Sequence, residues 1–156
     1  MSASNDATLK TWSLFTGAVT KTFKGHTGAV TCFDMSDKVI ATGSSDETVR
    51  LWNIDYGHQL YVFREKGLGM ISSIKLSTFH GIVVAGSYDS NIRVWGVETK
   101  KLLKTLKDHK DCVNSLLLYD LPNETPDSFS PLIISGSHDS SIKVWQTKKP
   151  KKRKKK

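Results

Sequence analysis

The sequence predicts an all-β protein assembled from repeated small antiparallel sheets. Three observations support this class. One ten-residue segment recurs along the chain, short stretches alternate aliphatic with polar side chains, and Gly, Asp and Ser occupy the joints between those stretches. Alternation with a period of two is typical of half-buried strands, and Gly, Asp and Ser are the residues that turns favour.

The recurring segment ends in a tryptophan that lies six residues after an aspartate. Its copies are ASNDATLKTW (3–12), GSSDETVRLW (43–52), GSYDSNIRVW (86–95) and GSHDSSIKVW (136–145). Successive aspartates are separated by 40, 43 and 50 residues. Chance does not produce so long a match in four places, so the chain is a repeat protein.

Each period contains the pattern of four short strands. The first is mixed, the second is a β-branched run with two apolar faces, the third alternates up to the tryptophan, and the fourth is short and aliphatic. The predicted strands are 7–12, 18–23, then 29–35, 39–42, 48–52, 59–63, then 70–76, 82–85, 91–95, 101–106, then 113–119, 132–135 and 141–145. Four antiparallel strands in about 40 residues form the blade of a β-propeller.

These residues resemble the WD-repeat β-propeller family over residues 1 to about 147. The resemblance divides the chain into repeats of about 1–24, 25–63, 64–106 and 107–147, followed by a basic tail over 148–156. The residue after each tryptophan is Ser13, Asn53, Gly96 or Gln146, never the Asp that names the family. A strict Gly-His pair occurs only at 25–26. These departures leave the fold prediction intact and mark the third repeat as degenerate.

The resemblance implies hydrogen bonds inside a blade, from the Trp indole through a Ser or Thr hydroxyl to a His and on to the Asp. The matching sets are His26, Thr42, Asp46 and Trp52, and His109, Ser135, Asp139 and Trp145. The pairs at the same positions in the other repeats are Asp6 with Trp12 and Asp89 with Trp95. The third repeat has Gly67 and Ala85 in place of His and Ser or Thr, so we expect no such network there.

A Ser, a His and an Asp also suggest a catalytic triad. A nucleophile must be exposed in a cleft beside an oxyanion-stabilising site, and catalytic machinery is not usually duplicated in successive repeats. We therefore interpret the sets as structural and predict a non-enzymatic protein with no metal or cofactor.

The resemblance also places the residue before each turn aspartate on the narrower face of a propeller, where partners commonly dock. Tyr88 and His138 hold that position, and Met70 lies near the start of its blade. Aromatic and Met side chains contribute disproportionately to interfaces, so these three are the expected anchors. The resemblance directs three further residues to the same rim: Thr31, Ser72 and Asn114. Ordinary loop exposure is the alternative interpretation.

The last repeat carries an insertion, LPNETPDSFSP, at 121–131. Its three prolines predict a loop between the first two strands of that repeat, on the opposite face. Phe129 is a candidate docking residue in it. A tolerated insertion without function is the alternative.

The net charge of +8 lies in the tail. Residues 148–156 hold eight cations: Lys148, Lys149, Lys151, Lys152, Arg153, Lys154, Lys155 and Lys156. The rest of the chain balances 15 basic against 15 acidic residues. Like charges repel and nothing apolar is present to bury, so we expect a disordered tail. It resembles a monopartite nuclear-localisation signal, which implies an import receptor; a solubilising tail and binding to phosphate backbones are the alternatives.

The composition indicates a soluble intracellular protein. Cys32 and Cys112 stand far apart, as expected of reduced thiols, and no apolar run has the length of a membrane span or a signal peptide. With the tail, this predicts the nucleus, the nucleolus included, with the cytoplasm as alternative.

Thirteen predicted strands make little more than three blades, and propellers have four or more. The chain is therefore expected to be a fragment of a longer propeller, to close its ring as a homodimer, or to be completed by a second chain. The function that follows is a scaffold for protein–protein interactions in a nuclear or nucleolar assembly. The alternatives are a factor that binds nucleic acid through the tail and a substrate-recognition subunit of a ubiquitin ligase.

Overall fold

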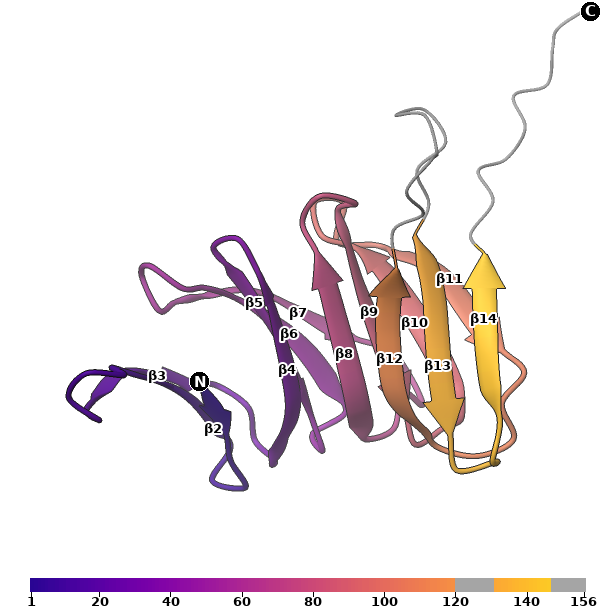
Figure 1. Cartoon of the computed structure of the whole chain (residues 1–156), viewed down its shortest axis with the longest axis horizontal. Helices are drawn as coiled ribbons and strands as arrows, with labels where there is room; N and C mark the ends of the chain where they lie inside the picture. The colour runs from indigo at the N-terminus through magenta and orange to yellow at the C-terminus, as the bar shows by residue number, and fades with distance from the viewer. Residues whose placement is uncertain (120–130, 147–156) are drawn as a thin grey trace, which may run out of the picture.

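A computed structural model of the chain describes residues 1–119 and 131–146, and all regular structure within them is β-strand (Figure 1). The strands are β1 (Ser2–Ala3), β2 (Thr8–Trp12), β3 (Val19–Lys24), β4 (Val30–Ser36), β5 (Val39–Ser44), β6 (Thr48–Asn53), β7 (Gln59–Arg64), β8 (Ile71–Ser77), β9 (Ile82–Ser87), β10 (Asn91–Gly96), β11 (Leu102–Lys107), β12 (Val113–Tyr119), β13 (Leu132–Ser137) and β14 (Ile142–Gln146). The predicted all-β class is confirmed. The described residues hold one strand more than predicted, the short β1.

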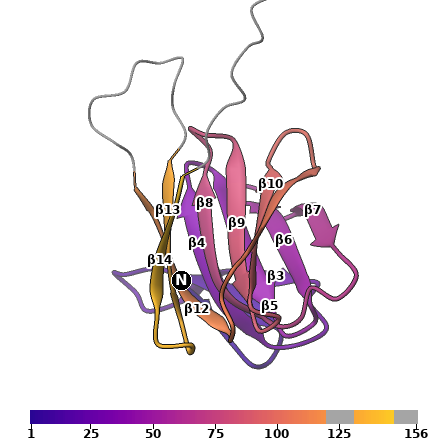
Figure 2. The same cartoon turned by 90° about the vertical axis from the view of Figure 1, so that its right-hand side faces the viewer.

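The strands form four antiparallel sheets in chain order. The first sheet is β1-β2-β3, the second β4-β5-β6-β7, the third β8-β9-β10-β11, and the fourth β12-β13-β14. The sheets stand side by side, with the first and fourth at opposite ends of an open row (Figure 1). Viewed from the β12–β14 end, the sheets lie one behind another (Figure 2). This is the stacked-blade arrangement that the repeat predicted.

The core consists of three hydrophobic clusters, one between each pair of successive sheets. Leu9 and Phe23 of the first sheet pack with Ile40 and Trp52 of the second. Between the second and third sheets lie Val49, Leu51 and Phe63 on one side, and Leu68, Ile71, Val83 and Trp95 on the other. Between the third and fourth lie Val84, Ile92, Val94 and Leu106, facing Val113, Leu116 and Ile133.

The second strand of each full sheet explains why this packing needs β-branched runs. Five of the six residues of β5 and of β9 are buried, because each strand has a neighbouring sheet on both faces. Full burial of one such aliphatic side chain stabilises the fold by about 1.5–3 kcal/mol. Sheet-to-sheet contact is therefore the main source of stability.

Candidate functional site

In the second sheet, a chain of hydrogen bonds joins a tryptophan to an aspartate. Trp52 Nε1 donates to Thr42 Oγ1 at 2.8 Å, and Thr42 Oγ1 lies 2.7 Å from His26 Nε2. His26 Nδ1 lies 2.8 Å from Asp46 Oδ2. Because the Thr42 oxygen accepts from the indole, its own proton is free to go to Nε2, which fixes the imidazole proton on Nδ1 for donation to Asp46.

The electrostatics of this network agree with that assignment. Burial lowers the pKa of His26 below its ordinary value of 6.5 despite the nearby Asp46. Burial alone would raise the pKa of Asp46, but hydrogen bonds from Thr48, from the Thr27 N–H and from His26 outweigh it and lower the pKa to about 2. At neutral pH the network therefore joins a neutral imidazole to an ionised carboxylate.

The fourth sheet contains a second copy of the network with matching distances. Trp145 Nε1 donates to Ser135 Oγ at 2.8 Å, Ser135 Oγ lies 2.7 Å from His109 Nε2, and His109 Nδ1 lies 2.8 Å from Asp139 Oδ2. The Ser141 hydroxyl, the Lys110 N–H and the His109 contact lower the pKa of Asp139 despite some burial. Ser135 is 1% exposed, so its hydroxyl is not placed for attack on a substrate.

The third sheet has a different arrangement around its tryptophan and its aspartate. Trp95 Nε1 is buried and has no hydrogen-bond partner among the described residues, since Ala85 stands where the hydroxyl would be. Asp89 is bound by Arg93, whose Nη2 lies 2.5 Å from Asp89 Oδ2 and 3.3 Å from the carbonyl oxygen of Gly67. The guanidinium thus links Asp89 to Gly67, the position of the missing histidine, whereas the imidazole of His26 joins its aspartate to a hydroxyl.

The first sheet retains part of the pattern. Trp12 Nε1 donates to Ser2 Oγ at 2.9 Å, although Trp12 is 44% exposed. Asp6 is exposed and accepts from the backbone N–H of Thr8 at 3.0 Å and from its hydroxyl at 2.6 Å. The position corresponding to His26 falls outside the sequence.

The sequence predicted a turn at each aspartate, but the hydrogen bonds that form this turn were not predicted. A serine two residues before it accepts the aspartate N–H, as Ser44 does from Asp46 at 3.0 Å. The aspartate in turn accepts from the residue two positions later, as Asp46 does from the Thr48 N–H at 3.0 Å and hydroxyl at 2.6 Å. The residue between them has a positive φ without being glycine; these are Ala7, Glu47, Ser90 and Ser140. The signal was present as Ser-x-Asp-x-Thr/Asn/Ser in every repeat.

The loops that carry the expected anchors are tied down by equivalent backbone bonds. The N–H of Tyr88 donates to the Met70 carbonyl at 3.0 Å, and that of His138 donates to the Cys112 carbonyl at 3.0 Å. The Tyr88 side chain is 53% exposed, His138 is exposed, and Met70 is half-buried. The backbone is held while the side chains face solvent.

The remaining rim candidates have a different environment. The Thr31 hydroxyl lies 3.0 Å from the Gly43 carbonyl oxygen and 2.5 Å from that of Ile71 in the third sheet. The Ser72 hydroxyl likewise contacts the carbonyls of Gly86, at 3.1 Å, and of Val113 in the fourth sheet. Thr31 and Ser72 therefore join successive sheets, which the sequence did not indicate. Asn114 at the same position of the fourth sheet is exposed.

Some predicted features lie outside the described residues. These are the insertion up to residue 130, with Phe129, and the tail over 148–156. Within 1–119 and 131–146, no group of three or more His, Cys, Asp or Glu side chains is placed to hold a metal ion. The same residues include no helix with the length and apolarity required to cross a membrane.

Comparison with known proteins matches the repeats to a family. The profile described as "WD domain, G-beta repeat" matches residues 17–53, 57–96 and 100–146. Mitochondrial division protein 1 of Schizosaccharomyces pombe is 27% identical over 149 residues, covering 80% of this chain and 23% of that protein. Transducin beta-like protein 3 of Mus musculus is 31% identical over 124 residues, covering 74% and 15%. The chain thus spans less than a quarter of the length of these relatives.

Solved structures give the same fold. The computationally designed Ika4 protein superposes with a TM-score of 0.75 at 29% identity, covering 92% of this chain and 82% of that one. The designed Ika8 protein also superposes with a TM-score of 0.75 at 29% identity, covering 93% of this chain but 42% of that one.

Proposed function

Because this chain belongs to the WD-repeat family, whose members generally mediate protein–protein interactions, we propose that it is a non-enzymatic scaffold for a nuclear or nucleolar protein assembly. Proteins of this family are typically scaffolds without enzymatic activity, and the buried Ser135 and His109 agree with that role. Partner proteins dock on the loops that carry Met70, Tyr88 and His138.

The observation that carries this proposal is the presentation of Tyr88 and His138. Both side chains are exposed at equivalent positions of adjacent sheets, on loops whose backbone is fixed by a hydrogen bond to the preceding segment. A fixed loop loses little conformational freedom on binding, so more of the contact energy remains as affinity. A large aromatic side chain held in this way is typical of an interface anchor.

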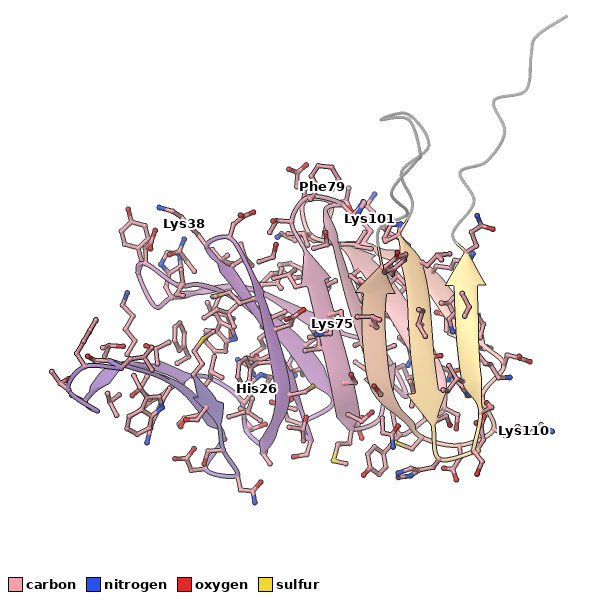
Figure 3. All side chains as sticks on the ribbon, in the orientation of Figure 1. His26, Lys38, Lys75, Phe79, Lys101 and Lys110 are labelled. Carbon is pink, nitrogen blue, oxygen red and sulfur yellow. The ribbon has the colours of Figure 1, made fainter. Side chains whose placement is uncertain are left out.

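The charges beside these loops favour a protein partner over nucleic acid. Lys110 lies at the opposite end of the sheets from Phe79 and Lys101 (Figure 3). Its N–H donates to Asp139, which places it beside the His138 loop, and the exposed acids Asp108 and Asp111 flank it. Mixed charge of this kind does not attract a phosphate backbone over a broad face.

A capture experiment tests the docking surface. The chain with Tyr88→Ala and His138→Ala is compared with the unchanged chain in affinity capture from nuclear extract, with quantification of each bound protein. We expect specific partners to fall at least about tenfold, because two interface anchors are lost. Tyr56→Ala is the matched control, since Tyr56 is 79% exposed on a loop between strands at the other end of its sheet. Equal capture by both variants would refute the proposed surface.

We further propose that the tail over 148–156 directs nuclear import. Eight cations in nine residues fit an acidic groove on an import receptor. Fusion of the chain to a fluorescent protein, with and without these residues, tests this. Nuclear accumulation is expected to require the tail, and equal distribution of the two fusions would contradict the assignment.

A second candidate function is binding of nucleic acid through the same cations. The eight positive charges of the tail favour it. Duplex DNA binding would then weaken steeply with salt, with a slope of up to about −7 in log K against log salt. This slope should vanish when residues 148–156 are removed. Binding that persists without the tail would point to the sheets instead.

A further inference from the structure

The two ends of the row of sheets expose apolar side chains at positions that are buried inside the row. Ile142 of β14 is 78% exposed, whereas its equivalents three residues before the tryptophan are at most 1% exposed: Leu9, Val49 and Ile92. Val144 is 61% exposed, whereas Leu51 and Val94 at the same position are 0% and 4% exposed. The outer face of the fourth sheet therefore corresponds to the face that, in the second and third sheets, is covered by the next sheet.

The first sheet exposes the opposite kind of face, the one that carries the tryptophan and that packs against the preceding sheet inside the row. Its Trp12 is 44% exposed, whereas Trp52 and Trp95 are 1% and 0% exposed. Leu14, two residues later, is 98% exposed. Its equivalents Ile54 and Val97 are half-buried and pack into the clusters between sheets.

Each internal junction brings these two faces together. The strand that ends in tryptophan places aliphatic side chains on the face toward the next sheet, and its tryptophan on the face toward the preceding sheet. The clusters repeat this arrangement three times along the chain. The two unpaired faces lie at opposite ends of the row (Figure 1).

We propose that these two faces bind a second copy of this chain, head to tail, so that two copies close a ring of eight sheets. Leu117 of β12 is 51% exposed and shares this face with Val144, because both pair with Ile134 of β13. In the proposed dimer, the outer face of the fourth sheet (Leu117, Ile142 and Val144) packs on Trp12 and Leu14 of the other copy, at both junctions. Two equal head-to-tail contacts related by a twofold axis form a closed assembly.

Three observations favour a second copy as the occupant. One chain carries both complementary faces, so two copies can each cover the exposed face of the other. Eight sheets lie within the range of four to eight blades that propellers adopt. The four sheets also superpose on 42% of the longer Ika8 chain, so they fit as part of a larger arc of the same curvature. This inference is independent of the proposed docking loops.

The oligomeric state of the chain in solution tests the proposal directly. Sedimentation equilibrium of the 156-residue chain should give twice the 17.4 kDa mass of one copy. Leu14→Asp and Val144→Asp should each raise the dimer dissociation constant by about 10- to 100-fold, because a charge replaces an apolar contact at both junctions. Tyr56→Asp is the control in the loop equivalent to that of Leu14, and should leave the constant unchanged.

Mixing the two variants separates this geometry from others. A heterodimer of Leu14→Asp with Val144→Asp has one junction intact and both charges in the other, so the mixture should dimerise more tightly than either variant alone. Circular dichroism of each variant checks that its strands are retained. A monomeric unchanged chain, open-ended polymers, or a dimer insensitive to Leu14→Asp would overturn the proposal; the last would indicate contact between two fourth sheets.

Discussion

Replacement of Thr42 by valine removes one buried hydroxyl and keeps the shape of the side chain. Thr42 is 0% exposed, and its oxygen accepts from Trp52 Nε1 at 2.8 Å and lies 2.7 Å from His26 Nε2. In Thr42→Val both the indole N–H and the imidazole nitrogen lose their partner in a region that water does not reach. The fold should be destabilised although no cavity is created.

The expected magnitude follows from the two groups left unpaired. Each buried polar group without a partner costs about 1–3 kcal/mol, so Thr42→Val should lower the free energy of unfolding by about 2–6 kcal/mol. Domains of this size have about 5–15 kcal/mol in total, so the loss is large. Thr42→Ser keeps the hydroxyl, as Ser135 does in the fourth sheet, and should lose only about 1 kcal/mol for one methyl group.

Urea unfolding followed by tryptophan fluorescence, at one protein concentration, measures these differences from the midpoint and the slope. Thr22→Val is the matched control, because Thr22 is an exposed threonine in the strand β3. If Thr42→Val and Thr22→Val unfold within about 0.5 kcal/mol of each other, the hydroxyl does not link the tryptophan to the histidine.

Two other substitutions test the same network. Ala85→Ser should stabilise the protein by about 0.5–1.5 kcal/mol, because it offers an acceptor to the unpaired Trp95 indole; a lower urea midpoint would contradict this. Stability should also fall with acid, measured as the urea midpoint at successive pH values. Below pH 6.5 the unfolded chain takes up a proton at His26 before the folded chain does, which lowers the stability of the fold. Between pH 3.8 and about 2, the contribution of ionised Asp46 to the stability, of the order of 1–2 kcal/mol, is lost. Asp46→Asn should flatten the curve below pH 3.8. A curve that this substitution leaves unchanged would refute the contribution of ionised Asp46 to stability.

Much of the fold could be predicted because its signals are local. The six-residue separation of Asp and Trp, the β-branched runs and the turn residues are all read within one repeat. The resemblance to the WD-repeat family implied a network of His26, Thr42 and Asp46, which the structure joins by hydrogen bonds. By the same resemblance, Gly67 and Ala85 marked the third repeat, whose Trp95 indole has no hydrogen-bond partner within residues 1–119 and 131–146.

Contacts between repeats could not be predicted in the same way. Nothing in the local pattern says that Thr31 and Ser72 bind carbonyls of the next sheet, because a Thr or Ser on a strand is equally common at an exposed rim. Arg93 is similar, since Arg50 at the same position of the second sheet donates to Gln59 at 2.6 Å and lies 3.9 Å from Asp46, whereas Arg93 lies 2.5 Å from Asp89. The second sheet has His26 as the close partner of its aspartate, and the third sheet has Gly67 at that position.

The sequence by itself therefore determined the blades, because the strands, the turns and the polar sets inside a blade depend on residues close together along the chain. Only the tertiary structure decided which faces of those blades are buried by a neighbour. Val49 and Ile142 occupy the same position in corresponding segments of two repeats, yet one is 0% and the other 78% exposed. The difference is the presence of a neighbouring sheet, and burial depends on what lies across the contact.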